Sequence, residues 1–193
     1  MERHLMKTDL RSLTFAVLAA PLLALGQATI STVAGTGTSG FSGDGGPAAS
    51  ARISASASFG VVADNAGNFY ICDGGNNRIR KVNAAGVIST VAGGGSAVGG
   101  GDGGPATNAQ LFPGSVAVDG AGNLYIAQGA SIRKVSTTGI ITTIAGTGKS
   151  TKPEEGKLPT ESPLNRPHGV VVGPDGLMYI ADSGNNRIVR IEK

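Results

Sequence analysis

Three tyrosines, the only ones in this chain of 193 residues, recur at nearly equal intervals, at positions 70, 125 and 179. The sequence around them recurs as well: residues 61–93 return as 116–146, and a shorter version returns as 170–193. Such a period is typical of repeat proteins, in which each unit is one small structure that packs only on its neighbours. The chain must therefore fold as about three similar units in a row.

Each unit has the pattern of short strands joined by tight turns. In residues 61–93 the apolar or alternating runs are VVA, NFYIC, IRKV and ISTVAG. The turns between them are rich in Asn, Asp and Gly, which accept the positive φ angles of tight hairpins. No segment after the first thirty residues has the period of a helix. The sequence predicts an all-β fold of four-stranded antiparallel units, which is the blade of a β-propeller.

Two stretches, YICDGGNNRIRKV (70–82) and YIADSGNNRIVRI (179–191), resemble NHL repeats, as do the GDGGPA connectors at 43–48 and 101–106. The resemblance covers essentially all of the domain 27–193. It implies a β-propeller, often six-bladed, that serves mainly as a binding platform, although a few relatives are enzymes. We expect blades at the ranges 59–93, 114–146 and 168–193, and an isolated fourth strand at 29–34.

The count of strands leaves two arrangements open. The strand at 29–34 has no first three strands of its own, and the blade at 168–193 has no fourth. Two chains could form a homodimeric six-bladed ring in which each N-terminal strand completes the partner's last blade. Alternatively, the chain is a partial propeller, part of a longer one.

The first 26 residues have the features of a secretory signal peptide. Three basic residues lie within 1–12, an apolar run follows at 13–26, and Ala24 and Gly26 fit a cleavage site. The apolar run is shorter than the roughly 20 residues of a membrane-spanning helix. We expect a secreted, periplasmic or cell-surface protein with no stable membrane span after cleavage.

Charge and cysteine content exclude several classes of function. The formal net charge is only +3 and there is no Trp, so a nucleic-acid partner is not expected. Basic residues recur on the third strands and are expected to face solvent: Arg80, Lys81, Arg133, Lys134 and Arg190. The single cysteine, Cys72, excludes an intrachain disulfide and is expected to be a small buried residue.

Several repeated positions are expected to be structural. The tyrosines should be at least partly buried between adjacent blades. At the turn between the second and third strands, an aspartate should cap backbone amides and an arginine should be its ionic partner. These positions are Asp73, Arg78, Asp182 and Arg187, whereas the middle unit has Gln128 and Ser131.

A catalytic or metal site receives little support from the sequence. His168, in Pro-His-Gly at the start of an inner strand, is the only histidine after the predicted signal peptide. The equivalent positions are Phe59 and Gly114, so one chain cannot build a three-histidine zinc site. Asp64 and Asp119 follow inner strands, where capping of hairpin turns explains them.

Two functions follow as hypotheses. The first is an exported binding module for a protein, glycan or small molecule, with no cofactor, whose long connectors lie on a rim of the propeller where ligands are met. The second is an enzyme of the propeller lyase or lactonase kind, with a divalent metal and His168 near the channel.

Overall fold

A computed structural model describes residues 28–54, 60–151 and 156–192 of the chain. The chain divides into two compact units, Met1–Ser31 and Thr32–Lys193. Of the first unit only residues 28–31 are described, and they form no helix or strand. The predicted signal peptide at 1–26 lies outside the described residues. In the part of the chain that is described, no helix is long and apolar enough to cross a membrane.

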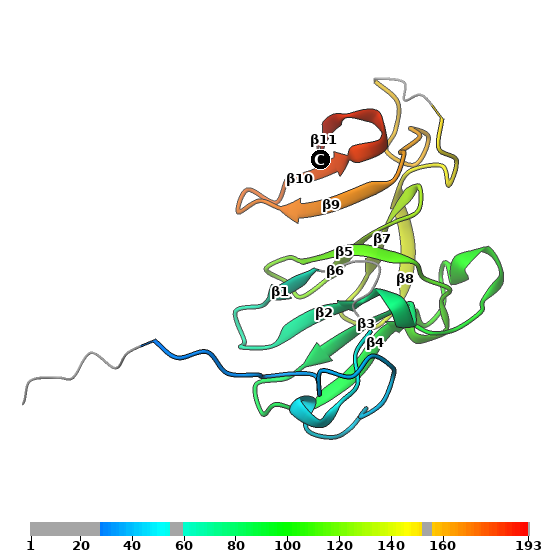
Figure 1. Cartoon of the computed structure of the whole chain (residues 1–193). Helices are drawn as coiled ribbons and strands as arrows, with labels where there is room; N and C mark the ends of the chain where they lie inside the picture. Colours follow the sequence, from blue (N-terminus) through cyan, green and yellow to red (C-terminus); the bar gives the residue numbers. More distant parts are fainter. Residues whose placement is uncertain (1–27, 55–59, 152–155, 193) are drawn as a thin grey trace, which may run out of the picture. The chain divides into compact units, whose positions relative to one another are not determined.

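The second unit contains three antiparallel sheets, each formed by strands that follow one another in sequence (Figure 1). The first sheet comprises β1 (Val61–Ala63), β2 (Phe69–Asp73), β3 (Arg78–Val82) and β4 (Ile88–Gly93). The second comprises β5 (Pro113–Val118), β6 (Leu124–Gln128), β7 (Ser131–Val135) and β8 (Ile141–Ala145). The third comprises β9 (Pro167–Val172), β10 (Met178–Asp182) and β11 (Arg187–Ile191).

The predicted fold class is confirmed, because all sheets are antiparallel and two are complete four-stranded units. The expected blade ranges 59–93, 114–146 and 168–193 each contain one of these sheets. The register also repeats. In both complete sheets the third and fourth strands pair with an irregularity at the same place, after Ile79 in β3 and after Ile132 in β7.

The isolated strand expected at 29–34 is not formed. Residues 28–34 belong to no sheet of the structure. An extended segment becomes a stable strand only when its backbone N–H and C=O groups pair with a neighbour. No strand among the described residues pairs with this segment.

The sheets pack against each other in chain order. Strands β1 and β2 of the first sheet contact β5 of the second. Strands β5 and β6 of the second sheet contact β9 of the third. Ile79, Leu111 and Ile126 are fully buried in the cluster between the first two sheets. Ile132 and Ile180 are fully buried in the cluster between the second and third.

The connectors that carry GDGGPA are anchored by buried alanines on the sheets that follow them, although each motif also has exposed residues. Pro47 forms a bridge to Val87, and Pro105 forms the equivalent bridge to Ile140. Each proline is followed by a short 3-10 helix, Ala48–Ser50 or Ala106–Asn108, whose first alanine is its buried residue. Four connector alanines have 0–1% of their surface exposed: Ala48, Ala51, Ala106 and Ala109.

Candidate functional site

Asp64 and Asp119 hold the hairpins that follow the first strands of their sheets. Asp64 accepts hydrogen bonds from the backbone N–H groups of Ala66 and Asn68, from the Asn68 side chain at 2.7 Å, and from the hydroxyl of Tyr70 at 3.2 Å. Asp119 accepts the equivalent four bonds, the hydroxyl of Tyr125 lying at 3.0 Å. The turn role predicted for these carboxylates is confirmed.

The electrostatics of the two hairpins agree with this role. The hydrogen bond from the side chain of Asn68 is the main cause that lowers the pKa of Asp64. Burial, together with the hydrogen bond to Asp119, raises the pKa of Tyr125 to about 12. Both carboxylates therefore stay ionised in their turns and are not poised for acid–base chemistry near neutral pH.

The tyrosines are partly or fully buried, as the repeat predicts. Tyr70 has 5% of its surface exposed and belongs to the cluster between the first two sheets. Tyr125 and Tyr179 are half-buried. The third hairpin has Gly173 in place of the aspartate, and Asp175 accepts the N–H of Leu177 instead.

The carboxylate at the end of each second strand anchors the chain that enters the same sheet. Asp73 accepts the N–H of Ser54 at 2.7 Å, and Asp182 accepts that of Asn165, also at 2.7 Å. In the middle sheet Gln128 takes over this role and accepts the N–H of Phe112 at 3.1 Å. The middle unit has thus kept the anchoring contact although it lost the charge.

The ionic partner of the aspartate differs between the sheets. Arg187 binds Asp182 as the sequence predicts, with Nε 2.9 Å from the carboxylate. The prediction for Arg78 is wrong: Asp73 pairs with Arg80, at 3.3 Å, and the guanidinium of Arg78 stacks on the ring of Phe41, 3.8 Å from its centre. Phe41 lies in the first connector, which supplies an aromatic face at this place.

Two arginines expected to face solvent are instead buried. Arg80 has 0% and Arg133 has 2% of its surface exposed. Each forms an ion pair with the aspartate of GDGGPA in the preceding connector. The guanidinium of Arg80 lies 2.7 Å from the carboxylate of Asp44, and that of Arg133 lies 2.5 Å from the carboxylate of Asp102. The same aspartates bind the fourth strand, through the hydroxyl of Thr90 and the backbone N–H of Thr143.

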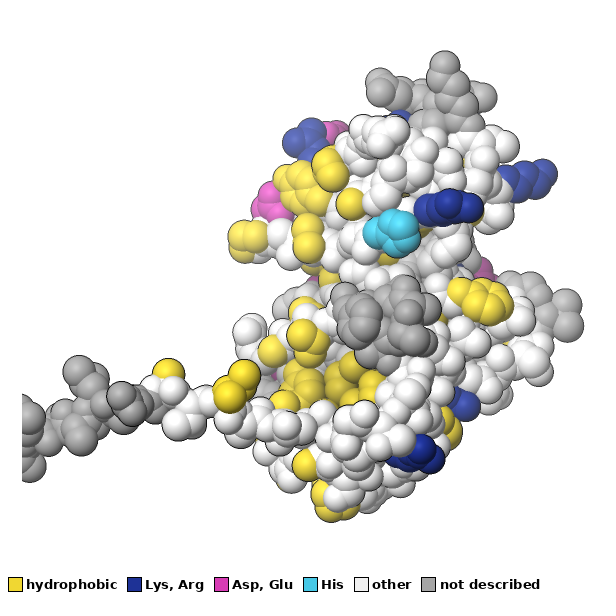
Figure 2. All heavy atoms as spheres, viewed as in Figure 1, with side chains coloured by type: hydrophobic (Ala, Val, Ile, Leu, Met, Phe, Trp, Pro, Cys, Tyr) yellow, Lys and Arg dark blue, Asp and Glu magenta, His cyan; other side chains and the backbone are white. Residues whose placement is uncertain are grey.

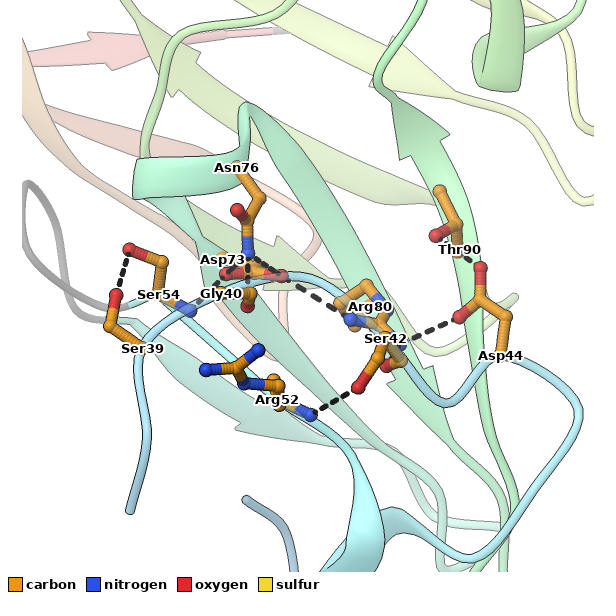
Figure 3. A network of polar contacts seen from close by, with 10 residues as sticks. All are labelled: Ser39, Gly40, Ser42, Asp44, Arg52, Ser54, Asp73, Asn76, Arg80 and Thr90. Carbon is orange, nitrogen blue, oxygen red and sulfur yellow. Dashed lines mark hydrogen bonds and ion pairs between the residues drawn. The ribbon is translucent and has the colours of Figure 1, made fainter. Parts of the chain in front are cut away.

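Figure 3 shows this network in the first sheet. Arg80 lies between Asp73 on its own sheet and Asp44 of the connector, and also donates to the carbonyl of Ser42. Asn76 donates both to Asp73 and to the carbonyl of Gly40. Buried charges are stable only when they are paired and hydrogen-bonded, as here. We call the Arg–Asp pairs Arg80–Asp44 and Arg133–Asp102 the connector latches.

Cys72 is buried, with 1% of its surface exposed, as the sequence predicts. Burial raises the pKa of its thiol to about 12, and Asp73 adds to the effect. Burial and the raised pKa both disfavour the thiolate, which is the nucleophilic form of cysteine.

The structure places His168 at the start of β9, the predicted strand start, with its side chain exposed to solvent. It lines a small cavity of about 120 Å³ with Phe112, Gln128 and Arg166, among others. Figure 2 shows the imidazole beside a basic side chain on this face. Within the described residues, no three His, Cys, Asp or Glu side chains gather to hold a metal ion.

Three exposed side chains surround this cavity, and we call Phe112, Arg166 and His168 the rim patch. Phe112 has 59% of its surface exposed. Arg166 forms no ion pair with the described residues, and its φ of +48° lies in the left-handed region that side chains rarely adopt. Strained backbone of this kind is often found where a side chain must be held for a ligand.

A larger groove of about 680 Å³ lies at the other end of the inner strands. Asp64, Tyr70 and Asp119 line it, but their polar groups are bound within their own hairpins. The two carboxylates of this groove are therefore already bound by their own turns.

Comparison with known families identifies the repeat. Residues 94–157 match the model of the Teneurin NHL domain, and residues 164–191 match the model of the NHL repeat. The chain contains NHL repeats. Its antiparallel sheets have the four-stranded pattern of β-propeller blades, complete in two of the three.

Curated and solved relatives of this NHL protein match only parts of it. Teneurin-1 of Gallus gallus is 36% identical over 100 residues, which cover 48% of this chain and 4% of teneurin-1. An auxiliary nutrient binding protein from Bacteroides ovatus is 26% identical, with a TM-score of 0.55 over 69% of this chain and 37% of that one. A protein of unknown function from Bacteroides thetaiotaomicron is 25% identical, with a TM-score of 0.54 over 64% of this chain and 32% of that one. The NHL chain thus spans well under two thirds of each of these proteins.

Sequence reasoning missed the connector latches, although the NHL repeats contain a signal for them. The first two blades combine GDGGPA in the preceding connector with an arginine in the middle of the third strand. The third connector lacks GDGGPA, and there Val189 stands in place of Arg80 and Arg133. The arginine and the connector aspartate are thus present or absent together.

Proposed function

We propose that this NHL propeller is an exported binding module whose ligand contacts the rim patch. The observation that carries the proposal is Arg166, which is exposed, held at a positive φ, and without an ion pair among the described residues. Beside it stand the imidazole of His168 and the exposed ring of Phe112. Loops held by a rigid β scaffold are common places for binding residues.

The chemistry of the patch favours a ligand with an anionic group next to an apolar or sugar face. A guanidinium binds carboxylate, sulfate or phosphate through two parallel hydrogen bonds. The Phe112 ring offers a flat apolar surface beside it. A protein segment, an acidic glycan or a small acid could each present this combination. The similarity to a nutrient-binding protein supports binding as the role of the face.

The rim patch supports binding better than catalysis. A propeller lyase or lactonase with a divalent metal would need several ligands beside His168. The part of the chain that is described brings no three such side chains together. His168 also has no carboxylate partner in that part of the chain that would orient it as a general base.

Export is the second part of the proposal, and residues 1–26 support it. Their basic start, short apolar run and small residues before Gln27 follow the pattern of a secretory signal. The mature protein would then be secreted, periplasmic or on the cell surface. The intact mass of exported protein should correspond to a chain that starts near Gln27, and a mass that starts at Met1 would contradict cleavage.

Binding can be tested with sulfated, carboxylated and neutral dextrans as probes, measured by titration calorimetry. We expect the sulfated or carboxylated probe to bind, and the variant Arg166→Ala to weaken that binding by roughly tenfold or more, since an ionic hydrogen-bonded contact is lost. Lys149→Ala, which removes an exposed charge of a connector, is the matched control and should bind like wild type. No binding of either anionic probe, or equal binding by the Arg166→Ala variant, would contradict the proposal.

A further inference from the structure

The third sheet has an open edge where the other two sheets carry a fourth strand. Ile79 in β3 pairs with Ala92 of β4, Ile132 in β7 pairs with Ala145 of β8, and both isoleucines are fully buried. Ile188 occupies the same position in β11 and has 70% of its surface exposed. A groove of about 520 Å³ follows this edge and is lined by the residues of β11 together with Leu164 and Ala145. Unpaired strand edges of this kind readily accept another strand.

The chain also contains a second segment with the sequence of a fourth strand, and this segment belongs to no sheet of the described residues. Residues 30–35 read ISTVAG, identical to residues 88–93, which contain β4 of the first sheet. They differ only twice from ITTIAG at 141–146. In the structure this ISTVAG segment forms no strand, and its Ile30 and Val33 have 103% and 61% of their surface exposed. The equivalent Ile88 has 0% exposed.

We propose that the ISTVAG segment of one copy pairs with β11 of a second copy, as a fourth strand of that copy's third sheet. The two complete sheets define the register. Val82 lies opposite Ile88 and Arg78 opposite Gly93 in the first sheet. By the same pairing, Ile191 of one copy lies opposite Ile30 of the other, and Arg187 lies opposite Gly35.

The backbone at Gly35 is already set for this pairing. The glycine that ends each fourth strand has a positive φ, +83° at Gly93 and +86° at Gly146. A Cβ atom there would lie 2.2 Å from the carbonyl oxygen of Asn77 or of Ala130, at the turn before the third strand. Gly35 has φ +91°, although within its own chain a Cβ atom would meet only the side chain of Ile53, at 3.6 Å.

A second copy fits better than another partner because the same chain contains both the ISTVAG segment and the unpaired edge of β11. When two chains associate head to tail, the ISTVAG segment of each can pair with β11 of the other. The assembly then contains six blades. The outer sheets also expose apolar side chains, Val61 at 71% in β1 and Val171 at 59% in β9. A copy placed at each end would cover these surfaces.

The test measures the mass of the purified chain in solution by light scattering, for wild type and three variants. Wild type should be a dimer. Ile30→Asp places a charge on the strand and Ile188→Asp places one on the receiving edge. Both residues are exposed within one chain, so these changes should leave each monomer folded. Each should raise the dissociation constant of the dimer by about 100-fold, because a charge would be buried in the new sheet.

Two controls make the result specific. The double variant Ser31→Thr/Val33→Ile converts the segment into the fourth strand of the second blade and should remain dimeric. A mixture of the Ile30→Asp and Ile188→Asp chains retains one intact strand and one intact edge, so it should form heterodimers although each chain alone is monomeric. A monomeric wild type, a dimer that survives both aspartates, or open polymers in place of a dimer would each overturn the proposal.

Discussion

At the scale of single residues, each of the first two blades uses one aspartate to hold the hairpin of its inner strand. Asp64 and Asp119 each collect four hydrogen bonds, one of them from the tyrosine that marks the repeat. The sequence predicts these contacts because the partners are only two to six residues apart. The burial of Arg80 and Arg133 could not be predicted in the same way, since their carboxylates lie 36 and 31 residues away.

Removal of the Tyr125 ring should destabilise the protein more than removal of its hydroxyl. Tyr125→Ala is expected to lower the free energy of unfolding by about 3 kcal/mol, the scale for loss of a large packed aromatic. Tyr125→Phe keeps the ring and should lose about 1 kcal/mol, because only the hydrogen bond to Asp119 disappears. Urea unfolding measures both values.

Tyr179→Phe is the matched control for the hydroxyl. Gly173 stands where the other two hairpins have an aspartate, so this hydroxyl has no such carboxylate to bind. This hydroxyl bonds the exposed side chain of Arg190 instead, a contact that solvent screens. The Tyr179→Phe variant should therefore lose less stability than Tyr125→Phe. Equal losses for the two phenylalanine variants would show that the Asp119 contact does not stabilise its hairpin.

At the scale of elements, the GDGGPA connectors are part of the blades that follow them. The connector latches join a connector, a third strand and a fourth strand through one aspartate, Asp44 or Asp102. Strand order and turn positions could be predicted from hydrophobic pattern and glycine spacing. The docking of the connectors could not, because glycine-rich sequence carries no periodic signal of burial.

Loss of one latch should destabilise the second blade and change its response to acid. Asp102→Ala leaves the Arg133 guanidinium buried without its carboxylate, and we expect a loss of about 2 kcal/mol at neutral pH. The loss stays below that of a fully buried pair, because 43% of the Asp102 side chain is exposed and solvent screens the charge. Asp175→Ala, at an exposed hairpin without an arginine partner, is the control.

The acid dependence follows from the pKa of Asp102. Burial raises this pKa, but hydrogen bonds from Thr143 and the charge of Arg133 outweigh burial and lower it below the ordinary 3.8. The folded state therefore gains stability from ionised Asp102 above the unfolded value, and loses it as pH falls below about 4. Urea unfolding from pH 6 to pH 2 should show a shallower loss for Asp102→Asn than for wild type. Parallel curves would contradict the latch.

At the scale of the whole molecule, two of the described sheets have four strands and the third has three, and residues 28–34 belong to no sheet. The sequence predicts the number of blades and the all-β class because both follow from the period of the repeat. It predicts the position of His168 at a strand start, but not the rim patch. The patch arises because the chain entering β5 brings Phe112 close to Arg166 and His168, far from it in sequence.

The central claim is that residues 30–35 of one copy pair with β11 of another copy as a fourth strand. Hydrogen exchange of the backbone amides tests it most directly, since paired strands exchange slowly and unpaired segments rapidly. In concentrated protein, residues 30–35 should be protected about as well as the identical residues 88–93. On dilution below the dissociation constant of the dimer, residues 30–34 should lose this protection, whereas residues 88–93 should keep it. The amide of Gly35 is left out of the comparison, because it donates to the carbonyl of Ala48 within its own chain. Rapid exchange of residues 30–34 at every concentration, with residues 88–93 protected throughout, would contradict the claim.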